Sequence, residues 1–65
     1  MTPNEIRAEL IKRGITQSDI AKEAHCRISN VNNVIHGRYK SQRLQKIIAK
    51  KIGLKFVEIW PESSN

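Results

Sequence analysis

The sequence lacks the cysteines with which many small proteins supplement the stability of a small core. With 65 residues it is short enough for one domain. A chain of this size buries only about 60% of the surface that it exposes when unfolded. Cys26 is the only cysteine, so no disulfide can form within one chain, and a lone thiol is typical of a reducing compartment. Stability therefore depends on the hydrophobic core, which at this length contributes on the order of 3–5 kcal/mol.

Long hydrophobic segments are also missing. The N-terminus, MTPNEIRAEL, has no apolar region of the kind found in signal peptides. No apolar run approaches the roughly 18 residues that a membrane-spanning helix needs. A helix lying on a membrane surface would need greater length and aromatic anchors than these short segments offer. We expect a soluble cytoplasmic protein that does not bind membranes.

Catalytic and cofactor motifs are not recognisable. The sequence has no Gly-rich phosphate loop, no paired-carboxylate site and no nucleophile with a base and an orienting group. His25, Cys26 and His36 lack a known zinc spacing and a clear fourth ligand, so a metal site is the weaker interpretation of them. We expect a protein that is not an enzyme and that requires no cofactor or metal.

Acidic residues are absent between Glu23 and Glu58. The cationic side chains of that stretch are Arg27, Arg38, Lys40, Arg43, Lys46, Lys50, Lys51 and Lys55, and the formal net charge of the chain is +6. A basic surface concentrates polyanions, and each phosphate that it neutralises releases condensed counterions. The pattern favours a nucleic-acid partner, while the same charges would also suit a solvated face that only aids solubility.

The sequence does contain short helical segments with clear start and stop signals. No alternating strand pattern appears, and no Asn-Gly or Asp-Gly hairpin signal lies between strand-like runs. The candidate N-caps are Thr2, Thr16 and Ser41, and the terminating glycines are Gly14, Gly37 and Gly53. These signals predict an all-α fold of four to five short helices over residues 1–61, followed by a flexible polar tail over residues 62–65.

Apolar residues mark the inward faces of these segments. The expected core positions are Ile6, Leu10, Ile20, Ala21, Ala24, Val31, Val34, Ile35, Leu44, Ile47, Ile48, Ile52, Phe56, Ile59 and Trp60. The alanines are small enough for another helix to approach closely. We expect Cys26 to be a small buried residue. Trp60 is expected to close the core, with a dimer contact as the alternative.

Residues 17–36 combine two short helical segments with a connection over residues 25–27. Two short helices joined in this way, with small residues where they cross, form a helix-turn-helix. The second helix of such a motif can lie in the major groove of DNA. Its expected outer face carries Ser29, Asn32 and Asn33, which are weak helix formers, and their clustering indicates hydrogen bonding rather than helix stability.

The stretch QSDIAKEAHCRISNVNNVIHG resembles the motif of the lambda-repressor-like family of helix-turn-helix proteins, also described as Cro/C1 or XRE-type. Gln17 matches the family's motif-opening glutamine, and Gly37 matches the glycine that ends the second helix. The inward positions of the motif are matched by Ile20, Ala21, Ala24, Val31 and Val34. Cys26 falls where a small apolar residue fills the turn. The segment IIAKKIGLKFVEIWP is also similar to the end of the Ner-like phage regulators.

One position departs from the family pattern. His25 occupies the turn position at which the family usually has a glycine with a left-handed backbone. Histidine tolerates a positive φ better than β-branched residues do, at a cost of about 1 kcal/mol. Two possibilities remain open: either the turn has another shape, or the histidine is left-handed and strained.

The resemblance implies roles for individual side chains on duplex DNA. Gln17 would donate a hydrogen bond to a phosphate from the N-terminus of its helix, and Arg27 would reach another phosphate. The candidates for contact with base edges are Ile28, Ser29, Asn32 and Asn33. Asparagine can bind N6 and N7 of adenine, and Ile28 can pack on a thymine methyl group. The candidates for holding the DNA backbone are Arg38, Tyr39, Lys40 and Arg43.

The resemblance further implies a sequence-specific regulator of transcription that binds double-stranded DNA in the nucleoid, more often a phage or prophage repressor than an activator. One motif reads only a few base pairs, so we expect a homodimer at least on DNA, with recognition helices about 34 Å apart. Two alternatives stay open. One is a protein-interaction module, as in antitoxins, with residues 56–60 docking a partner. The other is an architectural binder whose affinity follows salt but not sequence.

Overall fold

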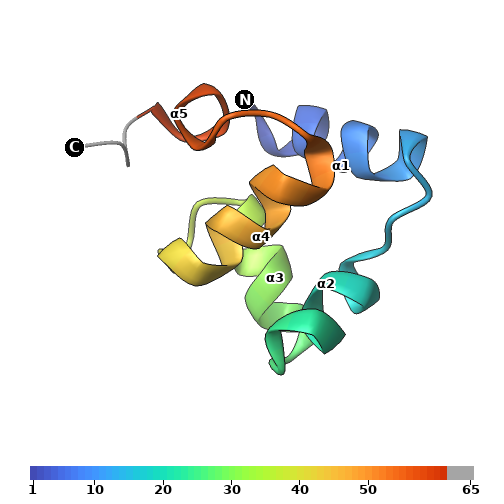
Figure 1. The fold of residues 1–65 in the computed structure, drawn as a ribbon. Coiled ribbons are helices and arrows are strands. Elements are labelled where there is room, and N and C mark those ends of the chain that lie inside the picture. The colour runs from blue at the N-terminus through green and yellow to red at the C-terminus, as the bar shows by residue number, and fades with distance from the viewer. Residues whose placement is uncertain (62–65) are drawn as a thin grey trace.

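The computed structural model describes residues 1–61, over which the chain forms five helices and no β-strand. The helices are α1 (Pro3–Lys12), α2 (Gln17–Ala24), α3 (Ile28–Ile35), α4 (Gln42–Ile52) and α5 (Phe56–Ile59). Figure 1 shows α1 and α5 at one end of the molecule, α2 at the other end, and α3 and α4 between them. The predicted all-α fold is confirmed, and the tail expected over residues 62–65 lies outside the described residues.

Three helices begin at the N-caps that the sequence predicts. The Thr2 hydroxyl accepts a hydrogen bond from the Glu5 N–H at 3.2 Å, and the Glu5 carboxylate accepts one from the Thr2 N–H at 2.7 Å. Thr16 and Asp19 form the same reciprocal pair, with both distances 3.0 Å. The Ser41 hydroxyl caps α4 through one such bond. Because the first N–H groups of a helix have no partner within it, these caps fix where α1, α2 and α4 begin.

Exposed carboxylates of the fold are stabilised in their charged form. The capping hydrogen bonds from backbone N–H groups lower the pKa values of Glu5 and Asp19 below their ordinary values. A salt bridge of 2.6 Å from Lys51 lowers the pKa of Glu23. That salt bridge also connects α2 to α4. It pairs Lys51, one of the basic residues between Glu23 and Glu58, with a carboxylate of the protein.

One hydrophobic core joins all five helices. Its buried members are Ile6, Leu10, Ile20, Ala21, Ala24, Val31, Val34, Ile35, Leu44, Ile48, Ala49, Ile52, Ile59 and Trp60. α4 packs against each of the other helices and therefore fixes α2 and α3 relative to one another. Ile47, Phe56 and Cys26 are only partly buried, which corrects the prediction that they lie within the core.

The two ends of the described chain meet beside the core. The amino group of Met1 donates a hydrogen bond to the Ile59 carbonyl at 3.0 Å, and Figure 1 shows the N-terminus next to α5. The prediction that Trp60 closes the core is confirmed, since only 8% of this residue is exposed. Its ring centroid lies 5.7 Å from that of Phe56. A buried Trp60 is not available as a contact between subunits.

Candidate nucleic-acid interface

The turn between α2 and α3 settles the question that His25 raised. This residue has φ 56° and ψ 46°, and it is the one residue other than glycine with a positive φ in the described chain. Its N–H donates to the Lys22 carbonyl, and the Cys26 N–H donates to the Ala21 carbonyl at 3.0 Å. This pair of hydrogen bonds is the Schellman arrangement, which requires a left-handed residue directly after the helix. The geometry of the turn is thus the usual one, adopted by histidine instead of glycine.

α3 has one buried and one outward face. Val31, Val34 and Ile35 are buried in the core. The predicted base-contacting residues lie on the other side: Ile28 and Ser29 are exposed, and Asn32 and Asn33 are partly buried. Ile28 leaves 51% of its surface exposed, so its apolar side chain is accessible to a partner on this face. The structure therefore places all four predicted residues on one continuous face.

The outward face of α3 is linked to the beginning of α2. The Asn32 amide donates a hydrogen bond to the Gln17 side-chain oxygen at 3.5 Å. This long hydrogen bond uses the oxygen of Gln17 and leaves its amide N–H groups to donate elsewhere. A predicted base contact and a predicted phosphate contact are thus coupled in position. No local pattern in the sequence predicts this pairing, because the residues are 15 positions apart.

The loop after α3 is attached to the same helix. The N–H groups of Arg38 and Tyr39 donate to the Asn33 carbonyl at 2.9 and 3.3 Å. The side chains of Arg38, Tyr39 and Lys40 are exposed, with 50% of Tyr39 accessible. Two cations and a phenol therefore lie beyond the C-terminal end of α3, while Arg27 is exposed at its N-terminal end.

Arg43, the remaining predicted phosphate contact, makes a hydrogen bond within the protein. Its guanidinium donates a hydrogen bond to the Ala24 carbonyl at 2.6 Å, across from the first turn of α4 to the last residue of α2. A cation at a helix C-terminus satisfies a carbonyl that lacks a partner and interacts favourably with the helix dipole. Arg43 therefore holds the helix-turn-helix together, a role that sequence reasoning missed.

A protein-family model described as winged helix-turn-helix DNA-binding matches residues 1–63. The chain therefore belongs to this family of helix-turn-helix DNA-binding proteins, and α2, the turn and α3 form its motif. No curated protein and no solved structure matches the chain. A wing is a β-hairpin, and residues 1–61 contain no strand, so the candidate interface of the described residues consists of helices and loops.

Membership of the family indicates a partner and a broad role. It supports binding to double-stranded DNA and points to a regulator rather than an enzyme. Residues 1–61 contain no group of three or more His, Cys, Asp or Glu side chains that could hold a metal ion. None of the described helices is long and apolar enough to cross a membrane.

Proposed function

We propose that this protein regulates transcription by inserting α3 into the major groove at specific sites in duplex DNA. The observation that carries the proposal is the outward face of α3. Polar and apolar groups lie there opposite a stripe that is fully buried in the core. Weak helix formers on that face add little to folding, so their value lies in what they contact.

Base readout is assigned to four residues of α3: Ile28, Ser29, Asn32 and Asn33. The Asn33 side chain has no hydrogen-bond partner within residues 1–61, so both its oxygen and its nitrogen can face a base edge. An amide of this kind fits adenine, which offers an acceptor at N7 and a donor at N6. The exposed Ile28 fits a thymine methyl group, since contact would remove its apolar surface from water.

Contacts with the DNA backbone are assigned to residues at both ends of the outward face of α3. Gln17 and Arg27 lie at the start of α2 and of α3, and Arg38, Tyr39 and Lys40 follow the end of α3. Contacts with phosphate fix register and orientation without reading sequence. Arg43, which the sequence assigned to this set, acts in our proposal by holding the end of α2 in position.

We further propose the Cro/C1-type, Ner-like subgroup, a phage or prophage repressor that occupies its operator as a homodimer. A left-handed turn residue and a described chain without a wing are consistent with that subgroup. Two copies on a two-fold site would read successive major grooves about 34 Å apart. Occupancy alone can exclude polymerase, so the mechanism needs no cofactor.

The competing interpretation is a protein-interaction module, and most of the surface expected to dock its partner is buried. Residues 56–60 were the expected docking end, but Ile59 and Trp60 are buried. Only Val57 remains as an exposed large hydrophobic residue there. A single exposed residue is a normal feature of a protein surface and needs no partner.

The test is selection of bound duplexes from a random pool at about physiological salt. We expect a recovered motif, with inverted half-sites about one helical turn apart. Asn33→Ala should relax the preference at one base position. Asn4→Ala, at an exposed asparagine in the first turn of α1, is the matched control and should recover the same motif as the unaltered chain. If no motif emerges and retention vanishes with modest added salt, binding is non-specific and the proposed function is wrong.

A further inference from the structure

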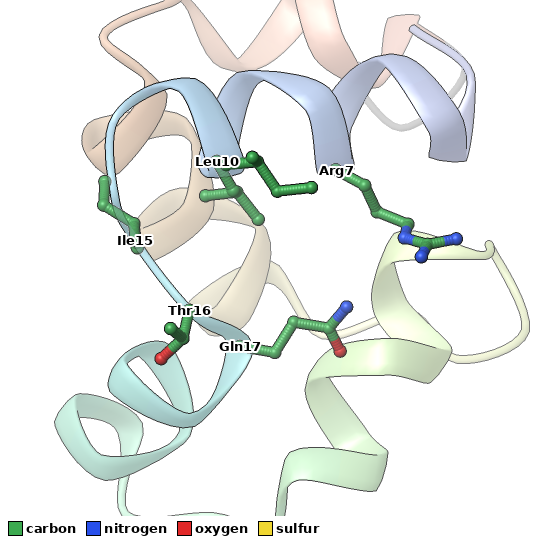
Figure 2. A pocket seen from close by; sticks show the side chains of 6 residues that line it. Arg7, Leu10, Ile15, Thr16 and Gln17 are labelled. Carbon is green, nitrogen blue, oxygen red and sulfur yellow. The ribbon is translucent and has the colours of Figure 1, made fainter.

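A pocket of about 200 Å³ lies between α1 and the start of α2. Its lining residues are Arg7, Leu10, Ile11, Ile15, Thr16 and Gln17. Figure 2 shows Arg7 and Gln17 on opposite sides of this pocket. Both side chains extend away from Ile15 and toward the side on which α3 lies. The Arg7 guanidinium of α1 and the Gln17 amide of α2 therefore both lie toward α3.

The charge of Arg7 is not used within the described chain. No hydrogen bond or salt bridge joins its guanidinium to another group of residues 1–61, and no acidic residue lies three or four positions away on α1. Arg13, at the C-cap of α1, forms a salt bridge with Glu9, which lowers the pKa of that glutamate. Asp19 follows the pocket residues Thr16 and Gln17 in the chain. Its carboxylate accepts a hydrogen bond from the Thr16 N–H and not from Arg7.

We propose that Arg7 and Gln17 together hold one backbone phosphate of the bound duplex at the mouth of this pocket. The inference rests on the proposed function and extends the DNA-binding surface to α1, outside the helix-turn-helix. Guanidinium groups bind phosphate through parallel N–H donors, and the Gln17 amide can supply a further N–H. Because Asn32 donates to Gln17, a phosphate held here also fixes the position of α3 along the groove.

The test compares Arg7→Ala with Arg13→Ala on the selected duplex and on a scrambled duplex, over a series of salt concentrations. Loss of one phosphate contact should make the slope of log affinity against log salt shallower by about 0.9. Arg7→Ala should also weaken binding to both duplexes by roughly tenfold. Arg13, at the C-cap of α1, is the matched arginine, and its substitution should leave slope and affinity unchanged. Arg7 is exposed, so thermal unfolding should show both variants folded.

A double-mutant cycle tests whether the two residues share one phosphate. Gln17→Ala should lower affinity without changing the salt slope, because the amide carries no charge. The double variant should lose less affinity than the product of the two single losses. Independent losses would overturn the shared contact. If the unaltered chain binds duplex and Arg7→Ala keeps its slope and affinity, this inference fails while the proposed function stands; if the unaltered chain binds no duplex, both fail.

Discussion

α3 and α4 each bury one apolar face in the same core, and they differ in how their N-termini are secured. Both helices are followed by a left-handed glycine, Gly37 after α3 and Gly53 after α4. α4 begins at Ser41, whose hydroxyl caps the backbone. α3 begins at Arg27, which makes no capping hydrogen bond through its side chain. α3 also has no acidic residue in its first turn and no basic residue in its last, so it gains nothing from its own dipole.

The exposed residues of the two helices also differ in helix propensity, and those of α3 are again the less favourable. α4 presents strong helix formers such as Lys46 and Lys50, whereas α3 presents Ser29, Asn32 and Asn33. A helix whose N-terminus has no side-chain cap and whose surface residues are weak helix formers depends on its neighbours. The turn at residues 25–27 and the loop at residues 38–40 provide that support. In the proposed function, the residues of α4 serve stability, and those on the outward face of α3 serve recognition.

The largest effect should come from the core of α4. Ile48 is fully buried, so Ile48→Ala should destabilise the chain by about 2–5 kcal/mol. That loss is comparable with the whole stability of a chain of this size, and helical circular dichroism should fall markedly at room temperature. Lys46→Ala, an exposed change on the same helix, should leave the unfolding transition nearly unaltered.

The outward face of α3 should show the opposite behaviour. Asn33→Ala should change the free energy of unfolding by less than about 0.5 kcal/mol. The same change should cost about 1–3 kcal/mol of discrimination between the selected duplex and one with a single altered base pair. Urea unfolding and binding measured on the same preparation separate the two quantities. A destabilisation as large as that of Ile48→Ala would remove the distinction between the helices.

Arg43 distinguishes support of the motif from contact with DNA. Arg43→Ala should destabilise the chain by about 1 kcal/mol, because the carbonyl at the end of α2 loses its charged donor in a partly exposed site. The salt slope of DNA binding should remain that of the unaltered chain. Unchanged stability together with a shallower slope would mean that Arg43 contacts a phosphate directly.

The strained turn before α3 predicts a smaller change of opposite sign. His25→Gly should stabilise the chain by about 0.5 kcal/mol. Glycine removes the strain of a positive φ, and this gain exceeds the extra conformational entropy that glycine loses on folding. His25→Val should destabilise it, since a β-branched side chain tolerates this conformation worst. Thermal unfolding of the three proteins should therefore rank glycine first and valine last.

Acid should weaken α1 and α2 more than α3. The folded pKa values of Glu5, Glu9, Asp19 and Glu23 are all lowered. Each lowered pKa contributes stability that is present above the ordinary values of 4.5 for Glu and 3.8 for Asp. This stability is lost as pH falls through the lower folded values. Thermal unfolding should show the midpoint falling over that range, and Asp19→Asn should fall less steeply.

Much of the fold follows from local signals in the sequence. Thr2, Thr16 and Ser41 act on backbone groups three residues away, so their caps could be predicted without knowledge of the fold. The positions of the core follow from helical periodicity in the same way. Ile47 and Phe56 were placed too deeply because periodicity gives the face of a side chain but not how far neighbouring helices cover it.

The features that the sequence did not predict all join distant parts of the chain. The Arg43 contact with Ala24 spans 19 positions, and the Asn32 contact with Gln17 spans 15. Arg7 and Gln17 line one pocket only because α1 and the start of α2 lie on opposite sides of it. Such pairs depend on how helices cross, which no local pattern specifies. The composition of the outward face of α3 could be predicted, and its connections to the rest of the motif could not.

The most direct test of the central claim removes one acceptor from the major groove. Adenines of the selected duplex would be replaced one at a time by 7-deazaadenine, which lacks N7 but still pairs with thymine. We expect that one replacement in each half-site weakens binding by about 1–3 kcal/mol for the unaltered chain and has little effect on Asn33→Ala. If no replacement changes affinity, or if Asn33→Ala is affected as strongly as the unaltered chain, then Asn33 does not read adenine in the groove.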